Sequence, residues 1–158
     1  MFREIVRKKQ KLENEECLEI LRNEKRGVLA VMGDDGYPYC LPINHYYNDE
    51  DGKIYFHSGK TGHKIDAIGA CDKVSFCVYD SGRKKEGHWS LYIKSVIVFG
   101  RISPVEDHAK SMEISRRLSR KFTDDEKYIE DEIKKFGANT LVLALEPEHI
   151  TGKLVNEA

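Results

Sequence analysis

Short apolar and alternating runs recur along most of the chain and predict β-strands. Val28–Met32 is a continuous apolar run, typical of a central strand, and Val74–Tyr79 alternates as a half-buried strand does. Asp34, Asp35 and Gly36 form a hairpin-turn signal. The predicted strands are Val28–Met32, Tyr37–Tyr47, Lys53–Ser58, Val74–Tyr79, Leu91–Ser103 and Thr140–Glu146, the last of them ending at Pro147.

Helical signals fall between and after these strands. Asn14 is a good N-cap for a helix over Glu15–Lys25, and Gly27 is predicted to stop it. Further helices are predicted over His63–Ala70, Val105–Phe122 and Asp125–Phe136. Successive hairpins with peripheral helices predict one mainly β domain over residues 1–158, built on a closed antiparallel sheet. No GxGxxG motif follows the first strand, which disfavours a dinucleotide-binding parallel sheet.

Composition narrows the class of protein further. The chain has 158 residues, 40% of them hydrophobic and 34% charged, and this disfavours both a disordered protein and a membrane protein. A formal net charge of −1 gives no general attraction for nucleic acid or anionic lipid. The charged N-terminus lacks a signal-peptide pattern, so we expect a cytoplasmic protein. Its four cysteines have neither zinc-site nor redox-pair spacing and are interpreted as small, partly buried hydrophobic residues.

The first stretch that suggests chemistry is Tyr39–Asn44, with Pro38 before it. Pro38 and Pro42 are an even number of residues apart, so their backbone nitrogens point toward the same edge of the predicted strand, and that edge is short of N–H groups. A flat ligand that needs few hydrogen bonds would fit along such an edge. The alternative is an ordinary edge strand that its prolines protect from pairing.

The second stretch, Phe56–Lys64, joins a strand to a short helix. His63 and Lys64 lie at the positive end of that helix, which is unfavourable unless an anion binds among them. A phosphate suits this site, because it could accept hydrogen bonds from the hydroxyls of Ser58 and Thr61 and from the free N–H groups near Gly62. The alternative is a solvated basic turn.

Two further features of the sequence do not point to a specific ligand. Trp89, the single tryptophan, is a candidate for a dimer interface, a site lid or local packing. The basic run of Arg116, Arg117, Arg120 and Lys121 is interpreted as a solvated helix face, because acidic segments flank it.

The order of these motifs resembles a known family. Gly36-Tyr-Pro-Tyr, Pro42-Ile-Asn44, Ile54-Tyr-Phe-His-Ser58 and Gly62-His-Lys64 are similar to the nitroimidazole-resistance branch of the pyridoxamine 5'-phosphate oxidase-like flavoproteins. The resemblance is strong over residues 26–78 and weaker up to residue 155. It implies an antiparallel split β-barrel, a homodimer and FMN at the subunit interface.

The resemblance also assigns cofactor-binding residues. The strand with Tyr39, Leu41, Pro42, Ile43 and Asn44 corresponds to the one along the isoalloxazine ring. Positions matching His57, Ser58, His63 and Lys64 take the phosphate and ribityl end, with His63 where the family usually has arginine. Ser95 resembles a polar position in contact with flavin, and Lys153 falls where the oxidases carry a tryptophan that packs on the ring.

Two functional readings follow from the resemblance. The first is an FMN-dependent oxidoreductase that acts on a small molecule, such as an aromatic nitro compound or a quinone, with NADH or NADPH as reductant. The second is a non-enzymatic flavin or haem binder or sensor on the same barrel. The chain lacks the oxidases' C-terminal arginine motif, so pyridoxamine-phosphate oxidation is not expected, and no residue stands out as catalytic.

Overall fold

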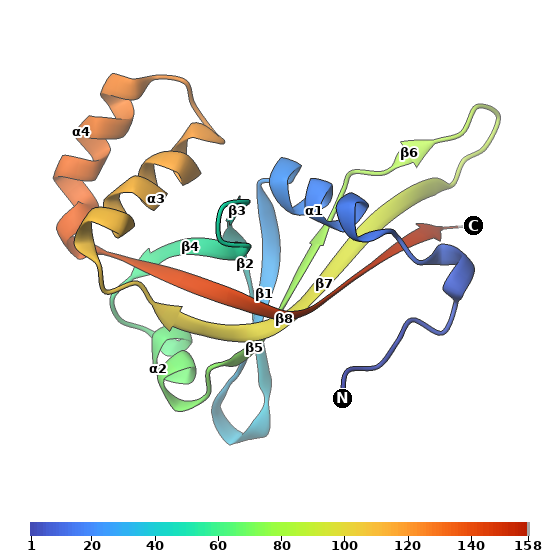
Figure 1. Ribbon diagram of the computed structural model, residues 1–158, viewed down its shortest axis with the longest axis horizontal. Coiled ribbons are helices and arrows are strands. Elements are labelled where there is room, and N and C mark those ends of the chain that lie inside the picture. The colour runs from blue at the N-terminus through green and yellow to red at the C-terminus, as the bar shows by residue number, and fades with distance from the viewer. Residues whose placement is uncertain (158) are drawn as a thin grey trace.

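One curled antiparallel sheet runs through the molecule and confirms the predicted mainly β split barrel (Figure 1). A computed structural model describes residues 1–157 and gives the strand order β2-β1-β5-β7-β8-β4-β3, with β6 paired to β7. Strands β2 and β3 form the two edges, so the sheet is curled but not closed by a continuous ladder. The strands are β1 Arg26–Met32, β2 Pro38–Asn44, β3 Tyr46–Asn48, β4 Lys53–Gly59, β5 Lys73–Tyr79, β6 Arg83–Lys84, β7 Leu91–Pro104 and β8 Thr140–Asn156.

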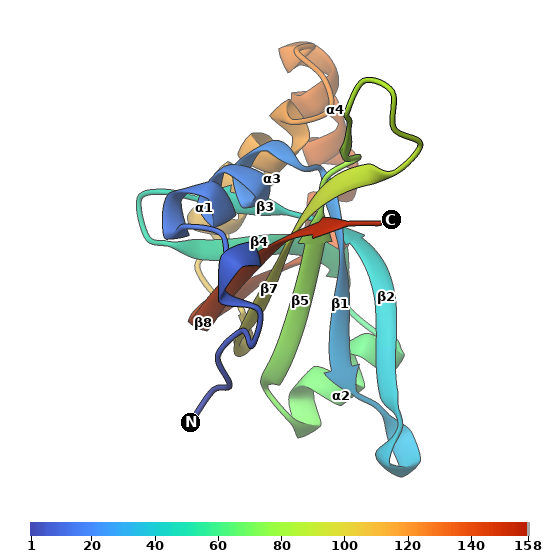
Figure 2. The same ribbon diagram turned by 90° about the vertical axis from the view of Figure 1, so that its right-hand side faces the viewer.

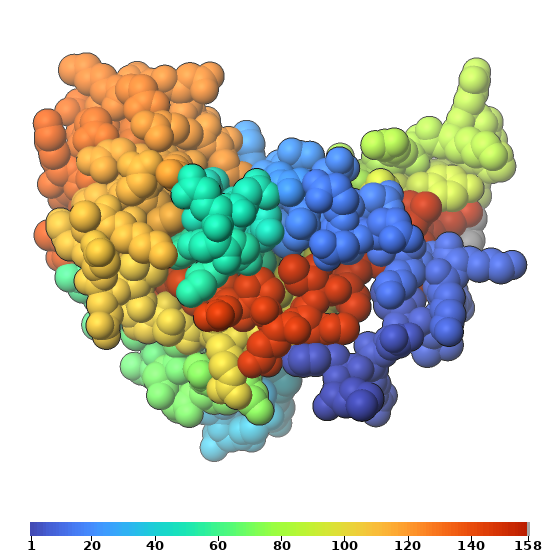
Figure 3. Space-filling model, in the orientation of Figure 1, coloured from blue at the N-terminus to red at the C-terminus, as the bar shows by residue number. Residues whose placement is uncertain are grey.

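The helices are placed around the sheet. Figure 2 shows α2 beside the hairpin of β1 and β2, and α3 and α4 pack together as a hairpin of helices at one end of β8. Figure 3 shows this pair and the hairpin that carries β6 standing apart at opposite ends of the molecule. Among residues 1–157, no helix has the length and hydrophobicity needed to cross a membrane. The helices are α1 Asn14–Asn23, α2 His63–Ala70, α3 His108–Arg120 and α4 Glu126–Phe136, with 3-10 turns η1 Lys8–Gln10, η2 Asp34–Gly36 and η3 Gly137–Asn139.

The core fills the concave side of the sheet. Alternate residues of the central strands point inward, and α1 adds its buried face to them. Burying these apolar side chains provides most of the driving force for this fold. The fully buried centre includes Leu21, Leu29, Ile54, Phe56, Phe76, Val78, Val96, Val98, Leu143 and Leu145.

The last strand was predicted to end at Pro147, and this is wrong. β8 continues to Asn156, with a bulge in its ladder with β7 immediately after Pro147. Phe99 is opposite His149 and Gly100 is opposite Pro147, so Glu148 is the extra residue. A Cβ atom at Gly100 would overlap the Glu146 carbonyl oxygen, which explains the glycine at this close approach.

The single strand predicted over Tyr37–Tyr47 is divided in two. His45 separates β2 from β3, is fully buried, and donates from Nε2 to the carbonyl oxygen of Leu21 at 2.8 Å. This bond ties the corner between the strands to the end of α1. The period-2 pattern alone does not contain this bend, because it depends on a contact with a distant helix.

Helix boundaries also differ from the predictions. α1 begins at Asn14, and its preceding residue Glu13 donates its backbone N–H to the Glu16 carboxylate at 3.0 Å. Gly27 does not stop the helix but lies in β1, where a Cβ would collide with the Phe76 ring. The helix predicted from Val105 begins at His108, because β7 extends to Pro104 and Asp107 caps α3.

Candidate functional site

The corner between β4 and α2 carries most of the predicted phosphate-binding residues. Gly62 has a φ of 119°, a conformation that side chains with a Cβ rarely adopt. Its carbonyl oxygen accepts hydrogen bonds from the backbone N–H groups of Ile65 (2.9 Å) and Asp66 (3.1 Å). The N–H groups of His63 and Lys64 therefore begin the helix, where N–H groups have no partner within it and attract anions.

Tyr39 and His63 bring the two chemical stretches of the sequence together. Their rings stack with centroids 4.3 Å apart and planes at 27°. His63 also lies with Nε2 3.7 Å from Oδ2 of Asp34, in the turn between β1 and β2. The edge strand β2 and the start of α2 thus form one continuous surface.

Lys64 gives this surface a positive charge, and His57 lies near it without adding a second one. Lys64 is half-buried, and within residues 1–157 its ammonium has no hydrogen bond or ion pair. Burial lowers the pKa of Lys64. His57 is open on one side yet surrounded by protein on others, so loss of solvent lowers its pKa, and the nearby charge of Lys64 lowers it further. His57 is therefore neutral at neutral pH, and Lys64 lacks a counter-ion.

Strand β2 exposes its outer edge as the prolines predict. In the described chain β2 pairs only with β1, in a register that sets Pro42 opposite Val28. Tyr39, Leu41 and Ile43 turn inward and pack against the core, whereas Pro42 is exposed. A ligand along this edge would therefore meet backbone more than side chains.

The hydroxyls predicted for the phosphate lie at the same corner. Ser58 donates from Oγ to the Gly59 carbonyl oxygen at 2.9 Å, and Thr61 is exposed in the loop before α2. Both stay predicted ligands, since a hydroxyl can rotate toward an anion.

Ser95 and Lys153 lie elsewhere in the chain. They are direct cross-strand partners on β7 and β8. His57 pairs with Val142, eleven residues before Lys153 on β8, and each residue of a strand advances about 3.3 Å. A single chain therefore does not bring Ser95 and Lys153 to the β4–α2 corner.

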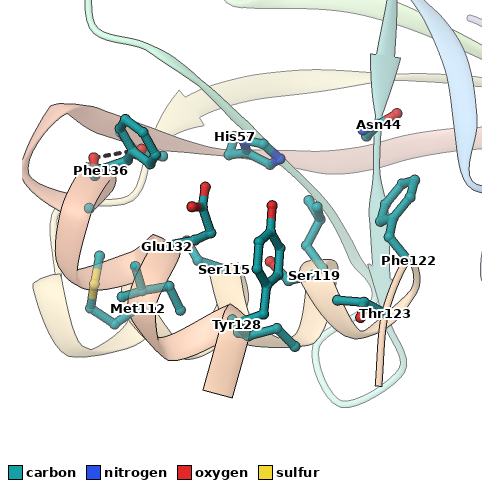
Figure 4. A pocket seen from close by; sticks show the side chains of 15 residues that line it. Asn44, His57, Met112, Ser115, Ser119, Phe122, Thr123, Tyr128, Glu132 and Phe136 are labelled. Carbon is teal, nitrogen blue, oxygen red and sulfur yellow. Dashed lines mark hydrogen bonds between the residues drawn. The ribbon is translucent and has the colours of Figure 1, made fainter. Parts of the chain in front are cut away.

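A pocket of about 420 Å³ opens between the α3–α4 hairpin and the sheet (Figure 4). Asn44 and His57 form its sheet side, so it adjoins the β4–α2 corner. The sequence analysis missed the helical residues, although Tyr128, Glu132 and Phe136 recur at i+4 spacing, which places them along one side of α4. The helical lining is Met112, Ser115, Leu118, Ser119, Phe122, Thr123, Tyr128, Ile129, Glu132, Ile133, Phe136 and Gly137, with Thr140 at the start of β8.

Three predictions about single residues change. Trp89 is 76% exposed, which excludes local packing and leaves the interface and lid interpretations. Cys40 is exposed and not partly buried. Lys121 is not solvated like the rest of its basic run: it is half-buried and donates to the carbonyl oxygens of Glu24 (2.6 Å) and His45 (2.9 Å), and burial lowers its pKa to about 8.

Comparison with known proteins gives the fold and the family. A structure of a proposed 5-nitroimidazole antibiotic resistance protein from Bacteroides thetaiotaomicron is 20% identical, covers 92% of this chain and 87% of its own, and has a TM-score of 0.76. The FAD-binding protein of Mycobacterium smegmatis is 21% identical over 94% of this chain and 99% of its own, with a TM-score of 0.67. The FAD- and heme-binding protein of the same organism is 21% identical over 95% and 74%, with a TM-score of 0.72.

These likenesses establish a common fold, and no curated protein matches the chain. The family model described as pyridoxamine 5'-phosphate oxidase matches residues 13–154, nearly the whole chain. The chain therefore belongs to the pyridoxamine 5'-phosphate oxidase family.

Proposed function

We propose that this protein is an FMN-dependent oxidoreductase that works as a homodimer. The observation that carries the proposal is the contact of β2 with the β4–α2 corner, where Tyr39 stacks on His63 beside the unpaired ammonium of Lys64. A phosphate would give Lys64 its missing partner at a helix N-terminus. The exposed backbone edge of β2 is suited to a flat ring.

The residues present fit FMN. Lys64, His63, Ser58, Thr61 and the N–H groups after Gly62 would hold the phosphate and ribityl end. The backbone of residues 41–43 would lie along the ring, with Tyr39 and Asn44 at its ends. When bound, FMN would supply the electron-transfer chemistry, while the chain binds and orients it and excludes water.

The outer face of the sheet supports a homodimer. Two cross-strand rows, Pro42-Val28-Cys77-Ile97 and Cys40-Ala30-Ser75-Phe99, share this face. Ile97 and Phe99 are 40% and 39% exposed in the single chain, and contiguous apolar surface of this kind marks an interface. Ser95 and Lys153 lie in the next row, beside the 58%-exposed Tyr79, so a second copy would bring them to the flavin.

The relatives suggest the class of reaction. The similar structures are described as FAD-binding or as a proposed 5-nitroimidazole antibiotic resistance protein, so aromatic nitro compounds are our proposed acceptors and NADH or NADPH our proposed reductant. The four free thiols suit a reducing compartment, and we propose the cytoplasm.

The test begins with the purified protein. We expect a flavin absorption band, FMN released on denaturation, and a dimer by sedimentation at micromolar concentration. FMN should bind more tightly than riboflavin, which lacks the phosphate. Reduction of bound FMN by NADH or NADPH, with turnover of a nitroaromatic, would establish the oxidoreductase; a colourless protein that binds no FMN would refute it.

A non-enzymatic binder is the second candidate. One similar structure is described as binding both FAD and heme, which favours a binding protein on the same fold. Stable FMN or haem binding without turnover under the same conditions would favour this reading.

A further inference from the structure

The α3–α4 hairpin has an uneven distribution of charge partners. Four of the five acidic residues within its two helices are paired with a basic residue of the same helices: Glu113 with Arg117, Glu126 with Arg120, Glu130 with Arg116 and Asp131 with Lys127. Glu132 is the fifth, and within residues 1–157 its carboxylate has no hydrogen bond or ion pair. The helices therefore pair their outer acidic residues and leave one inner carboxylate free.

Glu132 faces the pocket. In Figure 4 its carboxylate and the hydroxyl of Tyr128 both point into the cavity, toward the side where His57 lies. Glu132 is the one acidic residue in the lining, which contains no lysine or arginine, and a lowered pKa leaves His57 uncharged at neutral pH. The carboxylate is half-buried, so its charge is only partly screened by solvent.

The rest of the lining suits a flat organic molecule. Phe122 and Phe136 stand at opposite ends, and Met112, Leu118, Ile129 and Ile133 give apolar walls. A volume of about 420 Å³ lies in the range of small-molecule sites. Lys25 and Arg26 lie over the Phe122 ring at 5.5 and 5.7 Å, so positive charge is already present at that end and negative charge at Glu132.

We propose that this pocket binds a planar organic molecule that presents a positive charge or paired N–H donors to Glu132. As the acceptor subsite beside the flavin, it rests on the function proposed above, and it narrows the proposed nitro acceptors to those that also carry a cationic group or N–H donors. The preference for charge follows from the pocket alone and is measured without turnover.

Benzamidine, benzamide and benzoate form a matched set of probes, because they share one ring and differ mainly in charge. We expect benzamidine to bind the wild-type protein roughly tenfold or more tightly than benzamide, as charge-assisted hydrogen bonds do, and benzoate to bind weakest. Titration calorimetry or NMR shifts of the pocket residues would measure this, both in the FMN-loaded dimer and in protein freed of flavin.

Variants test whether Glu132 causes the preference for benzamidine. Glu132→Gln should reduce benzamidine affinity roughly ten- to a hundredfold while changing benzamide little. Glu132→Asp, which keeps the charge, should retain the order of the probes. Asp131→Asn removes an equal charge from the outer side of α4 and should change none of the three affinities. Thermal unfolding of each variant checks that the fold is kept.

Several results would overturn the proposal. These are equal binding of benzamidine and benzamide, no binding of any probe at millimolar concentration, or an unchanged preference in Glu132→Gln. The flavin titration is separate. Loss of FMN binding with the probe order intact would refute the proposed function and leave the pocket's preference standing. FMN binding without any preference for benzamidine would refute the pocket's preference and leave the proposed function standing.

Discussion

Two regions place helices beside the same strand, β4: α2 follows it at the β4–α2 corner, and α3 of the α3–α4 hairpin packs against it. The two regions distribute charge in opposite ways. The corner keeps a cation, Lys64, half-buried and unpaired at a helix start where it is electrostatically unfavourable. The hairpin pairs the acidic residues on its outside and leaves one anion, Glu132, facing inward. An unpaired charge at a pocket wall is a sign of a ligand in both regions, whereas paired charges are a sign of the scaffold.

The largest expected effect concerns His45, the buried residue between β2 and β3 that Lys121 contacts from the end of α3. Its carbonyl accepts from Lys121 of the α3 end, and its buried ring has a pKa lowered to about 3, first by burial and then by the charge of Lys121. The unfolded chain takes up a proton near pH 6.5, while the folded chain resists until about pH 3. Stability from this group is therefore complete above pH 6.5 and falls by up to about 1.4 kcal/mol for each pH unit below it.

His45→Gln is the comparison for this prediction, because glutamine keeps a donor for Leu21 but does not titrate. Chemical denaturation between pH 7 and pH 4 should give the wild type a steeper loss of unfolding free energy than the variant. Parallel pH profiles would mean that the folded chain protonates His45 as readily as the unfolded chain does, which would contradict the lowered pKa.

The next effect tests the cation of the corner. Lys64→Ala should weaken FMN binding by about one to two powers of ten, the value of a charge-assisted hydrogen bond, and leave riboflavin nearly unchanged. Lys60→Ala removes an exposed lysine from the same loop and serves as the control. Fluorescence titration of both flavins checks the result; an FMN affinity equal to that of the wild type would remove the phosphate assignment.

A smaller effect is expected from the backbone conformation of the corner, which can be tested apart from its charge. Gly62→Ala places a Cβ at a φ of 119° and should destabilise the protein by roughly 1–3 kcal/mol, with weaker FMN binding as well. Gly69 lies within α2, and a Cβ added there would meet open space. Gly69→Ala should therefore stabilise the protein by about 0.5–1 kcal/mol. Thermal melts of the two variants should therefore move in opposite directions.

The smallest effect is expected on the outside of the hairpin. Arg120 and Glu126 form an exposed pair with Nε and Oε1 2.8 Å apart. A double-mutant cycle to alanine should give a coupling close to zero, which salt reduces further, because solvent screens both charges. A large coupling that persists in salt would mean that these outer pairs, and not the apolar contacts, hold α3 to α4.

The sequence predicts the corner better than the hairpin, for a physical reason. Gly62, His63 and Lys64 follow a strand directly, so their placement depends on local backbone and helix-dipole rules. Glu132 stands at the border of an apolar face made by Ile129, Ile133 and Phe136, and its direction depends on where α3 lies. The bend at His45 and the continuation past Pro147 also depend on contacts between distant segments, which alternation along a single segment does not contain.

The bulge at Glu148 sets which side of β8 every later residue faces. Before it the inward residues are odd-numbered, Leu141, Leu143 and Leu145, and after it they are even-numbered, Ile150 and Leu154. Its partner β7 keeps one parity throughout, from Val96 to Ile102. The bulge thus absorbs one inserted residue, which in a regular strand would turn every later side chain to the opposite face. If Glu148 were paired in the ladder instead, Lys153 would turn toward the core and Leu154 outward. The outer face proposed for a second subunit therefore stays in phase with β7 because of an irregularity that belongs to neither the core nor the site.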